Sequence, residues 1–405
     1  MTSFEIHPLA RFESGATAIR RPKHFLQFSF DEQHAIQFSD QSLRYYYPPF
    51  ITAPGAPTPS IDLSNGFKDW IKQDESIDGH LDALLDTIQR HEEALLENGA
   101  SPQDARTQAD IITWRGMMTK IMTAPFDMFS DFEMNATYYQ GTIYIEENYS
   151  YGLAREQEQH SRKPTNRQQP PQELMQYWGY KFESLSTLPK PWAECTRKQI
   201  NTRDAEPVNT NIQYCSIVRT GIGNTSLIIG GEVDCIMGEK PDNPDAPISW
   251  VELKTTAEPP STHSRETMKF ERKLCRFWAQ SFLLGVPKII IGYRSQDGFL
   301  TRIQELETQK LPGMVSRSTG VWNGNVCINM TDAFFGFLKQ TIGAQEGIWR
   351  IKRAKDSQRI EVFQIEGTGT GLVVKQSFKE HREKMLAAEM NQKLGGNASA
   401  STAEE

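Results

Sequence analysis

Two short stretches in the middle of the chain alternate between apolar and charged residues. One, at 231–236, reads Gly-Glu-Val-Asp-Cys-Ile, and the other, at 250–255, reads Trp-Val-Glu-Leu-Lys-Thr. Alternation with a period of two is typical of a β-strand, whose side chains point to opposite faces in turn. Glu232 and Asp234 therefore share one face, and so do Glu252 and Lys254. If the two strands are neighbours, these carboxylates and the ammonium group meet on a small patch of sheet.

Such a group of acids needs a compensating charge. Two carboxylates about 4 Å apart repel each other by roughly 4 kcal/mol at an effective dielectric constant near 20. Either one of them binds a proton or a cation lies between them, and a hard dication such as Mg²⁺ or Mn²⁺ suits carboxylate oxygens. The alternative is a solvated hairpin with an acidic outer face. An acid on one strand followed by Glu-x-Lys on the next resembles the arrangement in PD-(D/E)XK nucleases, although the Pro-Asp pair of that name is absent.

Elsewhere the spacing of apolar residues predicts a mixture of helices and strands. Apolar residues three or four positions apart predict helices over 77–96, 101–121, 264–284, 332–342 and 376–393, and another that begins at Gln172. Stretches rich in β-branched and aromatic residues predict strands over 134–148, 211–219, 225–237, 287–293, 348–353 and 359–365. We expect the strands at 211–219, 225–237 and 250–255 to form a meander that carries the acids.

Two segments are too polar to predict a packed element. Residues 154–172 are expected to form a long loop, and residues 386–405 a disordered tail. The remaining pattern predicts a single α+β domain over residues 1–385. In that domain, central mixed, largely antiparallel sheets are flanked by helices.

Composition narrows the class of protein. The net charge of −7 argues against a generic basic coat protein of nucleic acids, but metal-binding carboxylates would contribute to the same acidity. The five cysteines are dispersed without zinc-finger or redox spacing, which predicts free thiols. The apolar runs are too short to span a bilayer and the first residues lack a signal-peptide core. We therefore expect a soluble intracellular protein with no membrane partner.

Several polar residues have two interpretations. Arg115 interrupts an apolar segment and is either a paired structural arginine or a ligand of phosphate or carboxylate. Glu183 is either an exposed residue at a helix end or part of a site. Lys273, Arg276 and Gln280 share one helix face, which either holds phosphates or is an ordinary solvated face.

Four motifs, in this order along the chain, resemble those of the DXO decapping family: Trp114-Arg115-Gly116, Gly179-Tyr180-Lys181-Phe182-Glu183, Gly231-Glu232-Val233-Asp234-Cys235 and Val251-Glu252-Leu253-Lys254-Thr255. The resemblance runs from about residue 20 to residue 340. The family includes the animal decapping exoribonuclease and the fungal subunit that partners the nuclear 5′→3′ exoribonuclease. His34 and Gly79 stand where animal members have an Arg and a Glu, and the resemblance favours the fungal nuclear branch.

The resemblance implies a PD-(D/E)XK nuclease-like core that hydrolyses RNA 5′ ends, namely incomplete caps, NAD caps and 5′-triphosphates, with Mg²⁺ or Mn²⁺. It implies metal ligands at Glu183, Glu232, Asp234, Glu252 and the Leu253 carbonyl. It places the catalytic residues at Glu232, Asp234, Glu252 and Lys254. It implies substrate contacts at Trp114, Arg115, Gly116, Cys215, Glu232, Lys254 and Gln280. It also implies a nuclear location and an exoribonuclease partner in RNA quality control.

The residue types suit this chemistry. Hydrolysis of a phosphoryl ester needs a nucleophilic water and stabilisation of developing negative charge, and two metal ions about 4 Å apart supply both. Lys254 would orient the water and hold the scissile phosphate, while Arg115 and Gln280 would clamp phosphates. Two alternatives stay open: a PD-(D/E)XK endonuclease that cuts internally, and a non-catalytic scaffold subunit of the exoribonuclease.

Overall fold

The computed structural model describes residues 2–50, 60–161, 170–243, 245–258 and 264–401, whose strands form two sheets. The ten-stranded sheet has the spatial order β1 (Thr2–Glu5), β17 (Arg359–Glu366), β16 (Ile348–Arg353), β7 (Phe132–Tyr139), β8 (Thr142–Glu147), β6 (Ile111–Trp114), β11 (Thr225–Glu232), β10 (Gln213–Ile222), β2 (Ile19–Phe30) and β3 (Ile36–Gln37). The seven-stranded sheet has the order β5 (Ile61–Asp62), β15 (Phe299–Glu307), β14 (Lys288–Arg294), β13 (Trp250–Ala257), β12 (Cys235–Ile236), β4 (Tyr45–Tyr46) and β9 (Thr187–Leu188).

Most neighbouring strands are antiparallel. The parallel pairs among the described residues are β6–β8, β6–β11, β13–β14 and β4–β12. The predicted fold class, mixed and largely antiparallel sheets flanked by helices, is confirmed.

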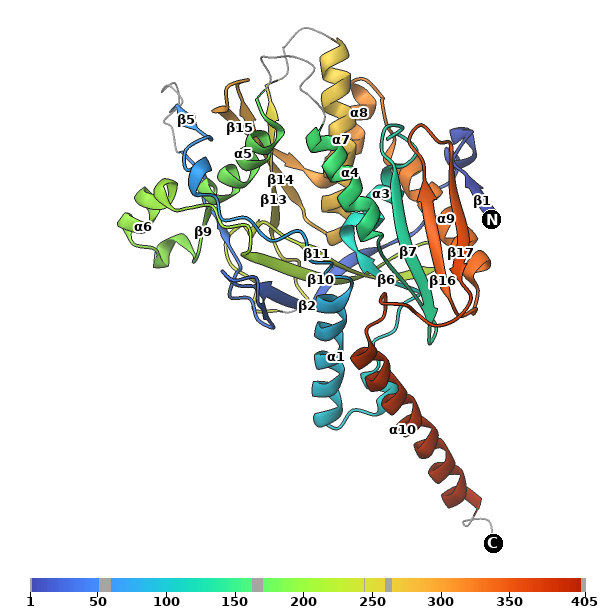
Figure 1. Ribbon diagram of the computed structural model, residues 1–405. Helices are drawn as coiled ribbons and strands as arrows, with labels where there is room; N and C mark the ends of the chain where they lie inside the picture. Colours follow the sequence, from blue (N-terminus) through green and yellow to red (C-terminus); the bar gives the residue numbers. More distant parts are fainter. Residues whose placement is uncertain (1, 51–59, 162–169, 244, 259–263, 402–405) are drawn as a thin grey trace.

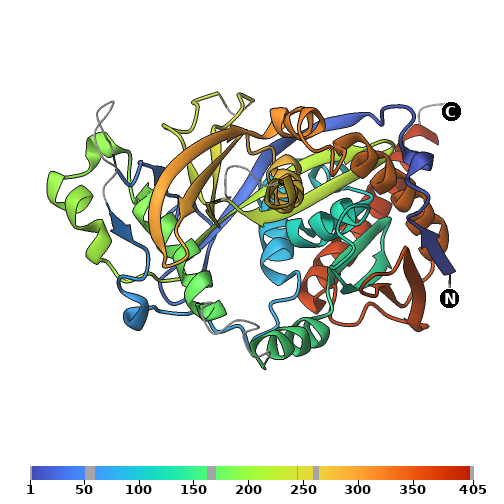
Figure 2. The same ribbon diagram turned by 90° about the horizontal axis from the view of Figure 1, so that it is seen from above.

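Helices surround the sheets, and one of them stands between the two. The helices are α1 (Asp82–Glu97), α2 (Pro102–Ala105), α3 (Arg115–Thr123), α4 (Tyr149–Ser161), α5 (Gln172–Leu185), α6 (Arg197–Thr202), α7 (Ser264–Leu284), α8 (Leu311–Arg317), α9 (Gly324–Ile342) and α10 (Gln376–Ser401). α7 is upright in Figure 1 and seen end-on near the centre of Figure 2. Within the described ranges, no helix combines the length and the apolar character needed to cross a membrane.

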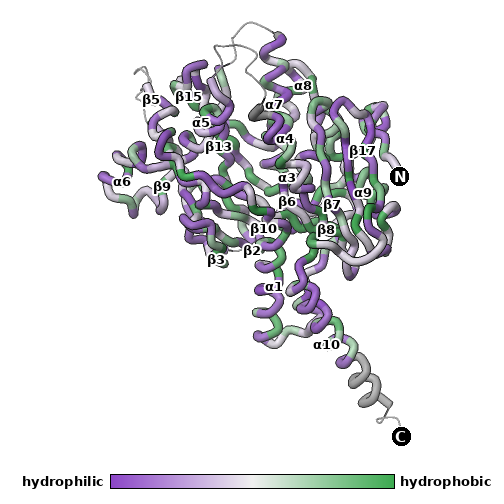
Figure 3. Tube along the Cα trace, in the orientation of Figure 1, coloured by the Kyte–Doolittle hydropathy of each residue, from purple (hydrophilic) through white to green (hydrophobic). Residues whose placement is uncertain are grey.

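Burial of apolar surface explains this arrangement. Leu274, Phe277 and Trp278 form a buried stripe of α7 and belong to the largest apolar core. A second core lies on the side of the ten-stranded sheet that α1 and α10 cover, and a third packs α5 against the seven-stranded sheet. Figure 3 shows hydrophobic stretches along the central strands and hydrophilic ones on the outer helices. Removing such apolar side chains from water is the main favourable term in folding.

The helix predicted over 101–121 is wrong, because this segment contains two helices and a strand. Ser101 does cap a helix, accepting a hydrogen bond from the backbone of Asp104, but α2 ends at Ala105. β6 follows, buried on both faces, with Ile111 in one core and Ile112 in another. A strand buried on both faces has a continuous apolar run, which periodicity alone does not separate from a buried helix.

The loop predicted over 154–172 is also wrong in its first part, where α4 continues to Ser161; residues 162–169 lie outside the described residues. Polar contacts hold α4, since Arg155 forms an ion pair with Asp131 at 3.1 Å and Tyr151 donates to the same carboxylate. An apolar pattern cannot signal such a helix. At the other end of the chain, α10 extends to Ser401 through most of the expected disordered tail.

The predicted meander is wrong, because the chain changes sheets within it. β11 pairs with β10 and β6 in the ten-stranded sheet, whereas β12 pairs with β13 in the seven-stranded sheet, with Cys235 opposite Val251. The crossing occurs at Val233 and Asp234. β13 also has a parallel neighbour, β14, to which it connects through α7. Such a β–α–β connection places β13 inside the sheet, with a helix packed over it.

Two glycines at the end of β11 allow a close approach of β6 and α3. A Cβ at Gly230 would lie 2.8 Å from the ring of Trp114. A Cβ at Gly231 would lie 2.8 Å from the Cβ of Arg115 and 2.9 Å from a methyl of Leu284. The Gly-Glu-Val-Asp motif therefore begins with a glycine because Arg115 occupies the space that a side chain would need.

Replacing Gly231 by alanine tests this packing. We expect Gly231→Ala to lower the free energy of unfolding by about 1–3 kcal/mol, since overpacking a filled core forces its neighbours apart. Gly336, on α9, has open space around its Cβ position, so Gly336→Ala should stabilise the protein by up to about 1 kcal/mol. Urea denaturation of the two variants measures both effects, and equal changes would contradict the packing argument.

Candidate metal-dependent active site

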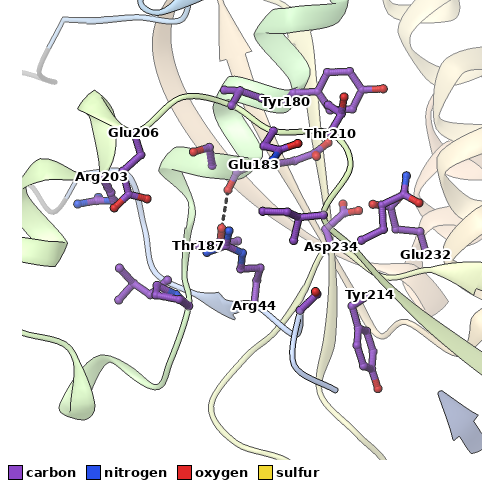
Figure 4. A pocket seen from close by; sticks show the side chains of 18 of the residues that line it. Arg44, Tyr180, Glu183, Thr187, Arg203, Glu206, Thr210, Tyr214, Glu232 and Asp234 are labelled. Atoms are coloured by element: carbon purple, nitrogen blue, oxygen red, sulfur yellow. Dashed lines mark hydrogen bonds between the residues drawn. The ribbon is translucent and has the colours of Figure 1, made fainter. Parts of the chain in front are cut away.

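The two sheets meet where four acidic side chains from three parts of the chain converge. Glu183 lies near the end of α5, Glu232 ends β11, Asp234 lies in the crossing segment, and Glu252 lies on β13. Figure 4 shows Glu183, Glu232 and Asp234 around one pocket of about 150 Å³. The structure thus brings together the predicted acids, and the reading of Glu183 as an exposed helix-end residue is wrong.

Glu252 is the most deeply buried of the four and is held by two cations. It has no exposed surface, and its Oε2 accepts a hydrogen bond from Nη1 of Arg115 at 3.0 Å. Its Oε1 lies 2.6 Å from Nζ of Lys254. Arg115 is therefore paired with a carboxylate of the cluster. The sequence had left two interpretations, a paired structural arginine and a ligand of phosphate or carboxylate, and the residue combines both.

Asp234 is fixed by the backbone of the neighbouring strand. Its Oδ2 accepts a hydrogen bond from the backbone N–H of Leu253 at 2.6 Å and lies 4.0 Å from Nζ of Lys254. The side chain of Leu253 points into the apolar core on the other face of β13. The alternation predicted for 250–255 is confirmed, because Val251 and Leu253 are buried in that core while Glu252 and Lys254 face the acids.

Burial and mutual repulsion raise the pKa of three of the acids. Burial, followed by repulsion from Asp234, raises the pKa of Glu232 to about 7 and that of Glu183 well above its usual value. Burial, followed by repulsion from Glu252, raises the pKa of Asp234 to about 6. Burial acts on Glu252 in the same direction, but Arg115 and Lys254 outweigh it and lower the pKa of that carboxyl.

The two cations stay charged because of the acids. Burial alone would lower the pKa of Lys254, but the fields of Glu252, Asp234 and Glu183 outweigh it and raise the pKa. The same balance raises the pKa of Arg115. Lys254 is therefore an ammonium group at neutral pH, able to donate hydrogen bonds but not to act as a base.

The donor set fits a divalent cation. Four carboxylates against two cations leave two excess negative charges in a buried space when all are ionised, and hard oxygen ligands of this kind suit Mg²⁺ or Mn²⁺. Within the described ranges, no three acidic, histidine or cysteine side chains already have their donor atoms gathered as around an ion. The ion pairs of Lys254 with Glu252 and Asp234 partly balance the charge instead.

The other predicted substrate residues lie near this cluster or behind it. Cys215 is buried on β10 directly opposite Glu232, and burial raises the pKa of its thiol. The indole of Trp114 donates to the carbonyl of His80 at 2.8 Å, and Gly116 lies in the first turn of α3. Gln280 is half-buried on α7. Among the described residues, no hydrogen bond or ion pair connects Trp114, Gly116 or Gln280 to the four acids. All five cysteines are free, as predicted.

The face of α7 with Lys273, Arg276 and Gln280, for which the sequence left phosphate binding and simple solvation open, is only partly available to a phosphate. Arg276 is paired with Asp127 at 2.7 Å, and Lys273 donates to the hydroxyl of Thr256 at 3.2 Å. Thr256 lies two positions after Lys254 on the same face of β13. Lys273 therefore lies along the strand that carries the acids, whereas Arg276 stabilises the contact between α7 and the segment after α3.

Sequence reasoning missed several residues that line the pocket beside the acids. Arg44, Tyr180, Thr210 and Tyr214 line it together with Glu183. Arg44 immediately precedes the short strand β4, which pairs with β12. A lone arginine before an aromatic run has no periodic signal that could have pointed to it.

Comparison with known proteins assigns the family. A family profile described as "RAI1 like PD-(D/E)XK nuclease" matches residues 20–389. The protein named "Decapping nuclease RAI1" from Emericella nidulans is 48% identical over 381 residues, which cover 94% of this chain and 98% of that protein.

Solved structures agree with this result. Scheffersomyces stipitis Rai1 in complex with (3′-NADP)⁺ and calcium ion has a TM-score of 0.82 at 28% identity and covers 95% of this chain and 100% of that one. Candida albicans Rai1 in complex with pU5 and Mn²⁺ has a TM-score of 0.81 at 26% identity, with the same coverage. The chain belongs to the RAI1-like PD-(D/E)XK nuclease family and is a hydrolase.

Proposed function

We propose that this protein is a metal-dependent RNA 5′-end hydrolase that removes incomplete caps, NAD caps and 5′-terminal pyrophosphate. The observation that carries the proposal is the buried group of four acids with Arg115 and Lys254 at the junction of the sheets. Membership of a family whose fungal relatives are named decapping nucleases supports RNA caps as the substrate class.

Glu183, Glu232, Asp234, Glu252 and the carbonyl of Leu253 would hold the metal, as one or two ions of Mg²⁺ or Mn²⁺. When bound, such ions lower the pKa of a water and stabilise negative charge on the scissile phosphate. Neighbouring residues of the chain fix the positions of these metal ligands. Asp234 is oriented by the backbone of Leu253, and Glu252 by Arg115 and Lys254.

Lys254 and Arg115 act on the substrate as fixed positive charges. Both are largely shielded from water, with exposed side-chain fractions of 22% and 14%. A charged donor in such a site stabilises developing charge more than it would in water. Lys254 would donate to the scissile phosphate and to the attacking water, while Arg115 keeps Glu252 ionised and clamps an adjacent phosphate.

Charge-removing substitutions at the acids test the assignment. We expect Asp234→Asn and Glu252→Gln each to lower kcat/KM for triphosphorylated or NAD-capped RNA at least about 100-fold, because each removes a charged ligand of the metal that would stabilise the negative charge of the transition state. This loss is measured from the rate at which 5′-monophosphorylated RNA is released in the presence of Mg²⁺ or Mn²⁺. Glu97→Gln, which removes an exposed acid on α1, is the matched control and should keep full activity. Unchanged turnover in both site variants would refute the roles given to these residues.

A circular RNA separates this function from internal cleavage. An enzyme that acts on the 5′ end should leave circular RNA intact while it processes the linear molecule of the same sequence. Cleavage of the circle at a comparable rate would instead support a PD-(D/E)XK endonuclease.

Metal binding should appear in stability as well as in activity. The folded-state pKa of Asp234, about 6, lies above its ordinary value of 3.8. Its ionised form is therefore disfavoured in the fold, and its charge destabilises the metal-free protein above pH 6. At pH 8 without metal, we expect Asp234→Asn to raise the free energy of unfolding by roughly 1–3 kcal/mol. The amide oxygen can still accept the hydrogen bond from Leu253.

Added Mg²⁺ should stabilise the wild-type protein more than the Asp234→Asn variant. It should raise the thermal midpoint of the wild-type protein, since a ligand that binds only the folded state stabilises it, and should raise that of Asp234→Asn less. Scanning calorimetry with and without EDTA measures both. An equal shift in the two proteins would place the metal elsewhere.

We also propose that the protein partners a nuclear 5′→3′ exoribonuclease in RNA quality control and is located in the nucleus. The resemblance to the fungal branch and the 48% identity to a fungal decapping nuclease support this proposal. We expect the double variant Asp234→Asn/Glu252→Gln to capture the exoribonuclease in a pull-down as well as the wild type does, because both side chains are shielded from solvent. Failure of both proteins to capture it would remove the partner role.

A further inference from the structure

The pocket beside the acids is lined by two arginines, Arg44 and Arg203, in addition to Glu183, Glu232 and Asp234. Glu206 lies near Arg203 at the side away from Asp234 in Figure 4. An arginine in a pocket is either part of the architecture or a site for an anion. The hydrogen bonds of the two arginines separate these roles.

Arg203 is architectural. Its Nε donates to the carbonyl of Leu185 at 2.9 Å, and its Nη2 donates to the carbonyls of Pro48 and Pro49, each at 3.2 Å. Its Nη1 donates to the carbonyl of Ile200. These hydrogen bonds join three separate segments of backbone. They occupy donors on all three nitrogens of the guanidinium, so few donors remain for a ligand.

Unlike Arg203, Arg44 has a side chain that is not used to hold the backbone together. Within the described part of the chain, its side chain forms no hydrogen bond and no ion pair. Burial is the main influence on it and lowers the pKa of its guanidinium, while Glu206 and Glu32 act on it only from beyond ion-pair distance. A half-buried guanidinium without a partner costs free energy unless something satisfies it. Arg44 lines the same pocket as Asp234 and Glu232.

The backbone holds Arg44 at this position. Its carbonyl accepts a hydrogen bond from the N–H of Ile236 at 2.9 Å, and the next residue, Tyr45, pairs with Ile236 in the β4–β12 contact. Ile236 is two positions from Asp234. The same short strand pair therefore fixes both the acid and the arginine, which makes the separation between them a property of the sheet and not of a loop.

Arg44 also lies on a different side of the acids from the other cations. Arg115 and Lys254 contact Glu252, and none of these three lines the pocket. An anion in the pocket would have the acids, with any bound metal, on one side and Arg44 on the other. We propose that Arg44 binds the terminal phosphates of the RNA 5′ end, which leave as pyrophosphate. This inference rests on the proposed function.

The size of the pocket favours the leaving group over the RNA chain. A volume of about 150 Å³ is below the 300–1,000 Å³ typical of pockets for drug-sized ligands. It suits a group of the size of pyrophosphate but not a run of several nucleotides. The fork of a guanidinium binds two phosphate oxygens at once, which an ammonium group does not reproduce.

Calorimetric binding of two products to the metal-loaded protein tests this assignment. The ligands are inorganic pyrophosphate, with Mg²⁺ in excess, and a 5′-monophosphorylated oligoribonucleotide. We expect Arg44→Gln to weaken pyrophosphate binding about tenfold or more and to change oligonucleotide binding less than about twofold. Arg44→Lys should lie between Arg44→Gln and the wild type. Arg317→Gln, which removes an exposed arginine on α8, is the matched control for loss of one charge and should bind like the wild type.

Two results would overturn the proposal. One is equal pyrophosphate affinity in Arg44→Gln and the wild type, and the other is a larger loss for the oligonucleotide than for pyrophosphate. The binding measurement needs no turnover. If the protein failed to hydrolyse capped RNA, the proposed function would be refuted, but pyrophosphate binding by Arg44 would still be tested separately.

A crystal structure of the wild-type protein with magnesium pyrophosphate gives a test that does not depend on the folding of variants. A phosphate oxygen about 3 Å from the Arg44 guanidinium would support the proposal. Pyrophosphate bound elsewhere would refute it.

Discussion

The pairing of Glu252 with Arg115 and Lys254 is the interaction on which the rest of this structure depends. Glu252 is fully buried, and its two partners come from either side of the junction of the sheets. Arg115 begins α3, directly after β6 of the ten-stranded sheet, and Lys254 lies on β13 of the seven-stranded sheet. Removing either partner would leave a buried charge uncompensated, which is strongly destabilising. The same arrangement holds an ionised carboxylate and two fixed cations at the junction, where the proposed function needs them. The three side chains that join the sheets are therefore also the ones to which the proposal gives a chemical role.

The rest of the architecture can be understood as support for that contact. The change of sheet at Val233 and Asp234 puts acids from β11 and β13 beside each other. Gly230 and Gly231 allow the β6–α3 turn to approach closely enough for Arg115 to reach across. α7 fills the space between the sheets with apolar side chains. Each of these features limits how far the acids can separate, even though their repulsion favours separation.

Local pattern together with the family resemblance predicted the residues that the structure gathers at the junction, but not the way the sheets present them. The alternation in 231–236 and 250–255 and the order of the four motifs identified the acids, Lys254 and Arg115, and the structure brings them together. The local pattern could not show that the chain leaves one sheet after Glu232 and enters the other at Cys235, because a strand has the same period whichever neighbour it pairs with. β6 has a continuous apolar run because both its faces are buried, so that it resembled a helix. Arg44 had no periodic signal, since its role depends on a pocket formed by distant segments.

The division of the site between the two sheets has a consequence for the newly made polypeptide. The four acids of the candidate site are contributed by residues 183 to 252, but β13 is held in place by β14, which ends only at Arg294. An emerging chain that stops short of this strand lacks the support that aligns Glu252 and Lys254 with Asp234. The geometry of the candidate site is therefore complete only late in synthesis, after β14 has been made.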